Sequence, residues 1–111
     1  MLVIDADTHI APTGGDFALE EHLERMDRAG VDKTLTWLKP DYDGEEIEGH
    51  CRYVYDATLA YPGKILGFGW ADPSVSVAHA KKMVRICTSW TLTRLNIDCL
   101  LIMQKRYNLL N

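Results

Sequence analysis

Two side chains near the start of the chain, Asp7 and His9, are of types that bind metal ions. They follow a short apolar stretch typical of a strand, and they stand two residues apart. In a strand, this spacing directs both side chains to the same face. A carboxylate and an imidazole that converge at the C-terminal end of a strand can coordinate a divalent cation. We therefore predict that Asp7 and His9 are metal ligands; the alternative is that the pair caps a loop.

The composition is that of one small globular domain. The chain has 111 residues, of which 47% are hydrophobic and 25% are charged, so a single core can form. Its cysteines, Cys51, Cys87 and Cys99, are odd in number and form no CxxC pair, which favours a reduced protein of the cytoplasm. The longest apolar run, residues 99–103, is too short to cross a bilayer. No signal peptide is visible, and we expect no membrane partner.

The net charge of −4 hides an uneven distribution. Residues 1–50 carry 13 acidic and 4 basic side chains, whereas residues 51–111 carry 3 acidic and 8 basic ones. A nucleic-acid-binding protein gathers its basic residues on one surface. Here they are scattered along the sequence, so we interpret the asymmetry as surface charge on helices and expect no nucleic-acid partner.

The chain reads as a repeated strand–helix unit. Apolar stretches and turn residues predict strands at 2–6, 33–38 and 64–70, and helical spacing predicts helices at 17–29, 45–60 and 76–87. We expect Asp16 to cap the first helix and Gly30 to end it. Strand centres at Ile4, Leu35 and Leu66 lie 31 residues apart, a period that indicates parallel strands joined by helical crossovers.

The predicted fold is therefore α/β, a partial (β/α)8 TIM barrel with about three to four strand–helix units. An unclosed part of a barrel exposes a strand edge, so self-association through this edge is expected. Residues 88–111 do not continue the pattern, because no glycine follows Gly69 and no proline follows Pro73. Residues 91–97 could form a fourth strand. We accordingly divide the chain into strand–helix units at 1–87 and an atypical tail at 88–111.

Three segments occur in the order and at the spacing of one enzyme family. They are IDADTHI at 4–10, MDRAGVDK at 26–33, and YPGKILGFGW at 61–70 followed by Asp72-Pro73. In these segments the chain resembles the amidohydrolase-related family of metal-dependent enzymes. This family includes aminocarboxymuconate-semialdehyde decarboxylase and resorcylate-type decarboxylases. The match covers residues 1–87. The three segments together are fairly specific for the family, whereas any one of them alone would be a weak signal.

The resemblance implies a (β/α)8 barrel that binds one divalent ion, commonly zinc, at the C-terminal mouth of the strands. It implies that Asp7 and His9 occupy the positions of the family's first two ligands, which are usually a His-x-His pair. An aspartate at the first position shifts the metal preference from zinc towards manganese or magnesium. The family's later histidine ligand and its proton-handling aspartate have no match here, so the chain resembles a truncated, N-terminal portion of such an enzyme.

The resemblance also offers a hypothesis for the tail. One possible codon string for residues 93–96, read in another frame, encodes Ala-Val-Lys, a typical fourth-strand segment of the family. A shift of reading frame near residues 88–92 would then explain the atypical sequence at 88–111.

On this resemblance we expect a hydrolase or decarboxylase that acts on a small organic molecule. Asp7 and His9 would help to hold a divalent ion, zinc in preference to manganese, which activates water or polarises a carboxylate or carbonyl. The chain alone would be an incomplete enzyme. The alternative is a catalytically inactive β/α fragment or an interaction module.

Other side chains that could do chemistry have simpler interpretations. We expect Asp5 to face away from Asp7 or to bond local backbone. His22 and His50 lie in charged helical stretches and should be solvated, and His79 should be structural. Cys51, on the apolar side of a helix, is more often a core residue than a nucleophile. Three aromatic residues near strand ends could either meet a substrate or fill the core: Trp37, Phe68 and Trp70.

Overall fold

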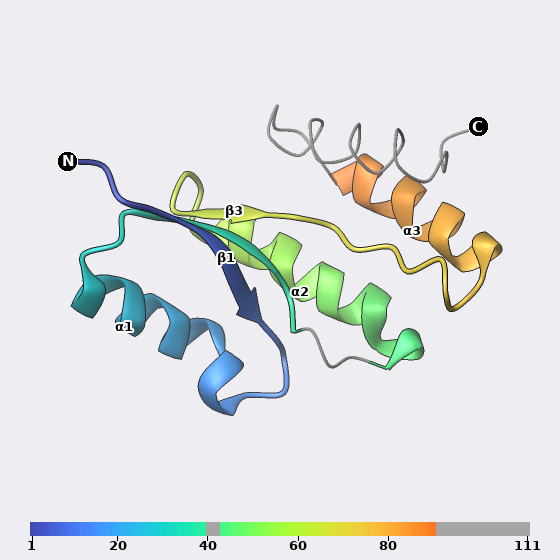
Figure 1. The fold of residues 1–111 in the computed structure, drawn as a ribbon, viewed down its shortest axis with the longest axis horizontal. Helices are drawn as coiled ribbons and strands as arrows, with labels where there is room; N and C mark the ends of the chain where they lie inside the picture. The colour runs from blue at the N-terminus through green and yellow to red at the C-terminus, as the bar shows by residue number, and fades with distance from the viewer. Residues whose placement is uncertain (40–42, 91–111) are drawn as a thin grey trace.

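Three parallel strands alternate with helices along the chain (Figure 1). The computed structural model describes residues 1–39 and 43–90. The strands are β1 (Ile4–Ile10), β2 (Lys33–Leu38) and β3 (Ile65–Gly67), and the helices are α1 (Leu19–Ala29), α2 (Ile47–Ala60) and α3 (Val77–Trp90). Short 3-10 helices, Gly15–Phe17 and Gly44–Glu46, precede α1 and α2. The predicted α/β class with parallel strands is confirmed.

The strands lie in the order β1-β2-β3, so each strand pairs with its neighbour in the sequence. Ile4 pairs with Lys33, His9 with Trp37, and Leu35 with Leu66. Residues paired across parallel strands project to the same face of the sheet, and the face alternates along each strand. The sheet therefore has two chemically distinct faces.

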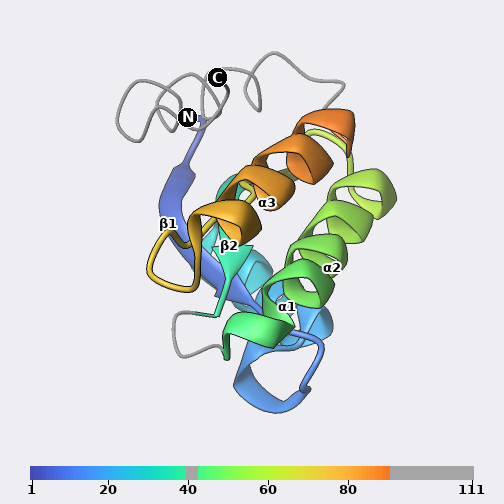
Figure 2. The ribbon, with the colours of Figure 1, turned by 90° about the vertical axis from the view of Figure 1, so that its right-hand side faces the viewer.

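One face of the sheet carries all three helices. Residues of β2 that point to this face, Thr34, Thr36 and Leu38, are buried. One apolar cluster joins α1, α2, β1 and β3, and a second joins α2, α3 and the end of β2. Figure 2 shows α2 and α3 side by side. We call this the helix face.

The opposite face carries none of the helices in the described ranges, and we call it the open face. It is formed by alternate residues of the three strands and of the segment after β3: Ile4, Asp7, His9, Lys33, Leu35, Trp37, Leu66, Phe68 and Trp70. Most of these side chains are apolar and half-buried or exposed. The open face is therefore a surface on which further apolar groups can pack.

Element boundaries depart from the sequence prediction in ways that matter for the site. The prediction ended the first strand at residue 6, but β1 runs to Ile10 and contains both candidate ligands. Asp16 does not cap the first helix, because it lies in the 3-10 turn and Ala18 stands at the helix start. Gly30 ends α1 as predicted, with a left-handed φ of 69° that glycine adopts without strain.

Later boundaries differ mainly at their ends. β2 matches its predicted range, whereas β3 is shorter than 64–70 and α3 extends three residues past the predicted end at residue 87. The predicted strand at 91–97 and most of the tail at 88–111 lie outside the described residues. No helix in the described part of the chain is both long and apolar enough to span a membrane.

Candidate metal site

Asp7 and His9 lie on the open face near the C-terminal end of β1. His9 Nε2 is 3.3 Å from Asp7 Oδ1. The His9 side chain is 29% exposed and that of Asp7 is 72% exposed, so the pair borders solvent. The prediction that the two side chains share one face is therefore confirmed.

A bulge in β1 decides which acidic residue accompanies His9. Asp5 pairs with Thr34 and Thr8 with Thr36, so three steps along β1 match two steps along β2. The extra residue breaks the alternation between Asp5 and Asp7. Asp5 consequently lies on the helix face, and its Oδ1 accepts a hydrogen bond from the Asp7 backbone N–H at 3.3 Å. Both expectations for Asp5 are met.

The ring of His9 is oriented by the backbone of β2. His9 Nδ1 lies 2.9 Å from the carbonyl oxygen of Leu38. A carbonyl oxygen only accepts, so Nδ1 carries the hydrogen of this bond and the Nε2 atom is left to face Asp7. Metal-binding histidines are usually held in this way by a second hydrogen bond on the other ring nitrogen.

The spacing of the two facing atoms suits a shared cation. Two lone pairs that face each other repel unless a proton or a metal ion lies between them. Zinc bonds to nitrogen and oxygen are about 2.0–2.2 Å long, so two ligands of one ion stand about 3–3.5 Å apart. The 3.3 Å between His9 Nε2 and Asp7 Oδ1 falls in this range. The same distance also fits an ion pair between the two side chains.

Trp37 of β2 connects the pair to an aromatic group on the same face. Its Nε1–H donates to Asp7 Oδ1 at 2.9 Å, and its ring stacks on His9 with centroids 6.1 Å apart. Phe68 and Trp70 pack against Trp37 with centroid distances of 5.2 and 6.1 Å. These three aromatic rings form a wall beside the candidate ligands, rather than part of the helix-face core.

Behind the site, the helix face holds a buried chain of hydroxyl groups that ends at a histidine. Thr8 Oγ1 is 2.8 Å from Thr36 Oγ1, which is 2.9 Å from Thr34 Oγ1. His22 Nε2 of α1 lies 3.0 Å from Thr34 Oγ1. Burial, and secondarily the positive charge of Arg25, lowers the pKa of His22.

The prediction that His22 and His50 are solvated is wrong. They are 4% and 6% exposed, respectively. Both histidines lie at helical spacing from apolar residues. His22 follows Leu19 by three positions and precedes Met26 by four. His50 has the same spacing from Ile47 and Val54. This spacing places both rings on the buried stripe of their helices, although most of their sequence neighbours are charged or polar.

Two further predictions concern residues away from the metal site. Cys51 lies in the core, 3% exposed, as predicted. His79 is partly buried in α3, and its Nε2 has no hydrogen-bond partner in the described structure. The Nδ1 atom of His50 is likewise buried without a partner there.

Asp7 and His9 are the two candidate ligands, and no third joins them in the described part of the chain. Across residues 1–39 and 43–90, no group of three or more His, Cys, Asp or Glu side chains could hold a metal ion together. No protein-family model matches the chain, and no curated protein matches it. The family resemblance, the choice of zinc or manganese and the reaction type stay predictions.

Proposed function

We propose that the chain forms the first strand–helix units of a (β/α)8 barrel enzyme of the amidohydrolase-related group. In this proposal Asp7 and His9 hold one divalent metal ion. The observation that carries it is the pair of facing atoms, His9 Nε2 and Asp7 Oδ1, 3.3 Å apart near the C-terminal end of β1. Catalytic groups of barrel enzymes come from the C-terminal ends of the strands.

The winding of the sheet supports a barrel over an open, doubly wound sheet. Doubly wound sheets carry helices on both faces, whereas a (β/α)8 barrel carries them only on the outside. Here α1, α2 and α3 all pack on the helix face, and the strands follow one another in sequence order. The open face would become the barrel interior, where its apolar side chains would be buried.

A metal ion at Asp7 and His9 would supply an activated water molecule or polarise a substrate carboxylate or carbonyl. Neighbouring residues of the chain would hold the two ligands in position. The Leu38 carbonyl holds the His9 ring, and Trp37 holds the Asp7 carboxylate. The aromatic wall shields one side from water and offers a flat surface to a small organic substrate. The reaction class is hydrolysis or decarboxylation.

Catalytic metal sites usually have three protein ligands, so two ligands make an incomplete site. Further ligands would come from outside the described residues. Zinc fits the mixed nitrogen and oxygen donors, and manganese is favoured by the added carboxylate.

The proposal is tested by titrating the chain with Zn²⁺ and with Mn²⁺ in a calorimeter. We expect one saturable site, with affinity lowered at least about tenfold by Asp7→Asn or His9→Gln. Asp5→Asn is the matched control. It removes a carboxylate two residues away that lies on the helix face, and its side-chain carbonyl can still accept the Asp7 N–H.

Two results would contradict the metal site. One is the absence of saturable binding to the folded wild-type chain, which would favour the inactive fragment or interaction module. The other is an equal loss of affinity in Asp5→Asn, which would indicate general attraction to acidic side chains. Circular dichroism of each variant separates loss of the site from loss of the fold.

A further inference from the structure

Two cysteines from different helices meet behind the open face. Cys51 of α2 and Cys87 of α3 belong to the same apolar cluster and are 3% and 6% exposed. The two side chains are close enough that each thiol shifts the pKa of the other. Neither residue takes part in the candidate metal site. Two thiols in contact, one on each of two neighbouring helices, are a chemically reactive arrangement when an oxidant can reach them.

The backbone after β3 is shaped around this pair. The Trp70 N–H donates to Cys51 Sγ at 3.3 Å, and the Cys51 thiol lies 3.7 Å from the Trp70 carbonyl oxygen. Gly69 stands directly against Cys87, because a Cβ at residue 69 would overlap Cys87 Sγ and lie 2.7 Å from Cys87 Cβ. The missing side chain at Gly69 therefore lets α3 bring its thiol close to Cys51.

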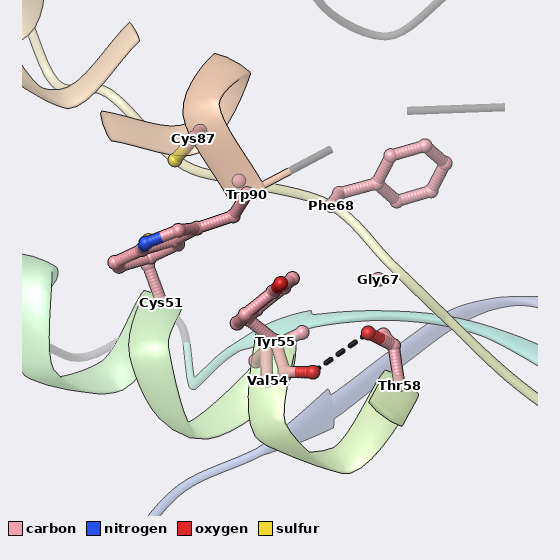
Figure 3. A pocket seen from close by; sticks show the side chains of 9 residues that line it. Cys51, Val54, Tyr55, Thr58, Gly67, Phe68, Cys87 and Trp90 are labelled. Carbon is pink, nitrogen blue, oxygen red and sulfur yellow. Dashed lines mark hydrogen bonds between the residues drawn. The ribbon is translucent and has the colours of Figure 1, made fainter. Parts of the chain in front are cut away.

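A small pocket is lined by both cysteines. Figure 3 shows Cys51 and Cys87 on facing sides of α2 and α3, with the Trp90 ring beside them. Tyr55 and Phe68 contribute to the other walls. The pocket has room for a molecule about the size of water. Hydrogen peroxide is not much larger, so it is the oxidant that this pocket suits.

We propose that Cys51 and Cys87 form a peroxide-sensitive pair that closes a disulfide between α2 and α3. In the first step the Cys51 thiolate attacks one peroxide oxygen. The O–O bond breaks, an S–O bond forms, and the departing hydroxide takes up a proton to become water. In the second step the Cys87 sulfur attacks the Cys51 sulfenic acid. The S–O bond breaks, the S–S bond forms, and the proton of Cys87 leaves with the hydroxide as a second water.

The groups around the two thiols indicate which cysteine reacts with peroxide first. The hydrogen bond from the Cys87 thiol lowers the pKa of Cys51, against the effect of burial, and the Trp70 N–H adds to the lowering. The pKa of Cys87 is raised, because its thiol is engaged by Cys51 and because it is buried. The Trp70 N–H, 3.3 Å from Cys51 Sγ, is placed to stabilise a Cys51 thiolate. Cys51 is therefore assigned as the thiol that peroxide oxidises first, and Cys87 as the one that resolves the sulfenic acid.

Peptide mapping tests the pair directly. Trypsin separates the three cysteines into peptides 34–52, 86–94 and 95–105. The dilute, folded chain is treated with hydrogen peroxide, blocked with N-ethylmaleimide and digested without reduction. We expect a cross-linked species of peptides 34–52 and 86–94, two hydrogen atoms lighter than the sum of the separate peptides. The same chain oxidised in urea should lose this selectivity.

Two outcomes would overturn the proposal. One is that both thiols are recovered blocked at a peroxide dose that oxidises the urea-unfolded chain. The other is that Cys99 takes part in the main cross-link of the folded chain. A Cys99→Ser variant supplies a second measurement, since it should form the Cys51–Cys87 bond with undiminished yield.

The order of attack has its own test. Cys87→Ser should accumulate a sulfenic acid at Cys51 that dimedone labels, several-fold more than Cys51→Ser labels Cys87. Equal labelling of the two variants would refute the assigned roles. Near-ultraviolet circular dichroism checks that each serine variant remains folded, and alanine replaces serine where it does not.

Discussion

The glycine after β3 offers the sharpest test of how closely α3 approaches the sheet. A Cβ at Gly69 would overlap Cys87 Sγ and lie 2.7 Å from Cys87 Cβ. The sulfur can rotate away, but the Cβ atom is fixed to the backbone of α3, so either the helix or the segment after β3 must shift. Overpacking of this kind costs about 1–3 kcal/mol. We expect Gly69→Ala to lie at the upper end, because a rotamer change cannot relieve the second contact.

Gly49 of α2 provides the matched control. A Cβ there would meet nothing within 4 Å, and the residue is exposed in a helix. Gly49→Ala should therefore raise the free energy of unfolding by about 0.5–1 kcal/mol. The two alanine variants add the same methyl group, and they should change stability in opposite directions.

Urea unfolding followed by circular dichroism measures both changes. Repeating Gly69→Ala in a Cys87→Ala background should recover part of the loss, because the sulfur is gone while the Cβ remains. The close approach of α3 to Gly69 is refuted if the free energy of unfolding of Gly69→Ala lies within about 0.5 kcal/mol of that of the wild type. An equal loss in both Cys87 backgrounds would show that the Cβ contact, and not the sulfur, carries the cost.

Three further predictions concern the metal site, a buried histidine and a helix cap. Trp37→Phe keeps an aromatic ring but removes the N–H that holds Asp7; a hydrogen bond to a charged group is worth about 1.5–3 kcal/mol. Since the Asp7 side chain is 72% exposed, we expect the Zn²⁺ binding free energy to weaken by about 1 kcal/mol, which is about a fivefold loss of affinity by calorimetry. The control Trp70→Phe should show no such loss. Burial lowers the pKa of His22 below its ordinary value of 6.5, so the unfolded chain binds the proton more readily and stability falls as the pH drops below about 6.5. The urea midpoint should decline between about pH 7.5 and about pH 5.5, and a slope unchanged in His22→Gln would contradict this cause. Asp43 and Glu46 form a capping box before α2, with side-chain to backbone bonds of 3.2 and 3.1 Å. Asp43→Ala should cost about 1 kcal/mol in the same unfolding assay, whereas Glu45→Ala, which leaves both bonds in place, should cost less.

The element pattern was predictable because strong local signals bound it. β2 was predicted at its observed range, since Gly30 ends the preceding helix and Pro40 follows the strand. β1 was placed too early, because its second half, from Asp7 to Ile10, is mostly polar and lacks a strand-like apolar run. Pairing with the β2 backbone keeps those residues in a strand, and such pairing has no signature in a local window.

The candidate site was predictable in part. The shared face of Asp7 and His9 follows from strand geometry, but the partners that hold them come from β2. Trp37 and the Leu38 carbonyl lie about thirty positions away in the sequence, and only the strand register brings them to Asp7 and His9. Burial of His22 and His50 is hard to predict from the sequence, because their charged neighbours suggest a solvated position while only the helical spacing favours the core.

The bulge in β1 sets how many ligands this strand can give. In a regular strand, Asp5, Asp7 and His9 would all project to the open face, and three donors of one strand would stand beside one another. The extra residue turns Asp5 towards the helix face, near His22, and leaves two donors. The neighbouring strand ends add aromatic side chains to the open face, Trp37 from β2 and Phe68 after β3. A complete metal site built on Asp7 and His9 therefore needs donors from outside the described residues, and in the proposed barrel the later strands would supply them. Such donors would converge on the pair only if the sheet closes around its open face, as the proposed barrel requires.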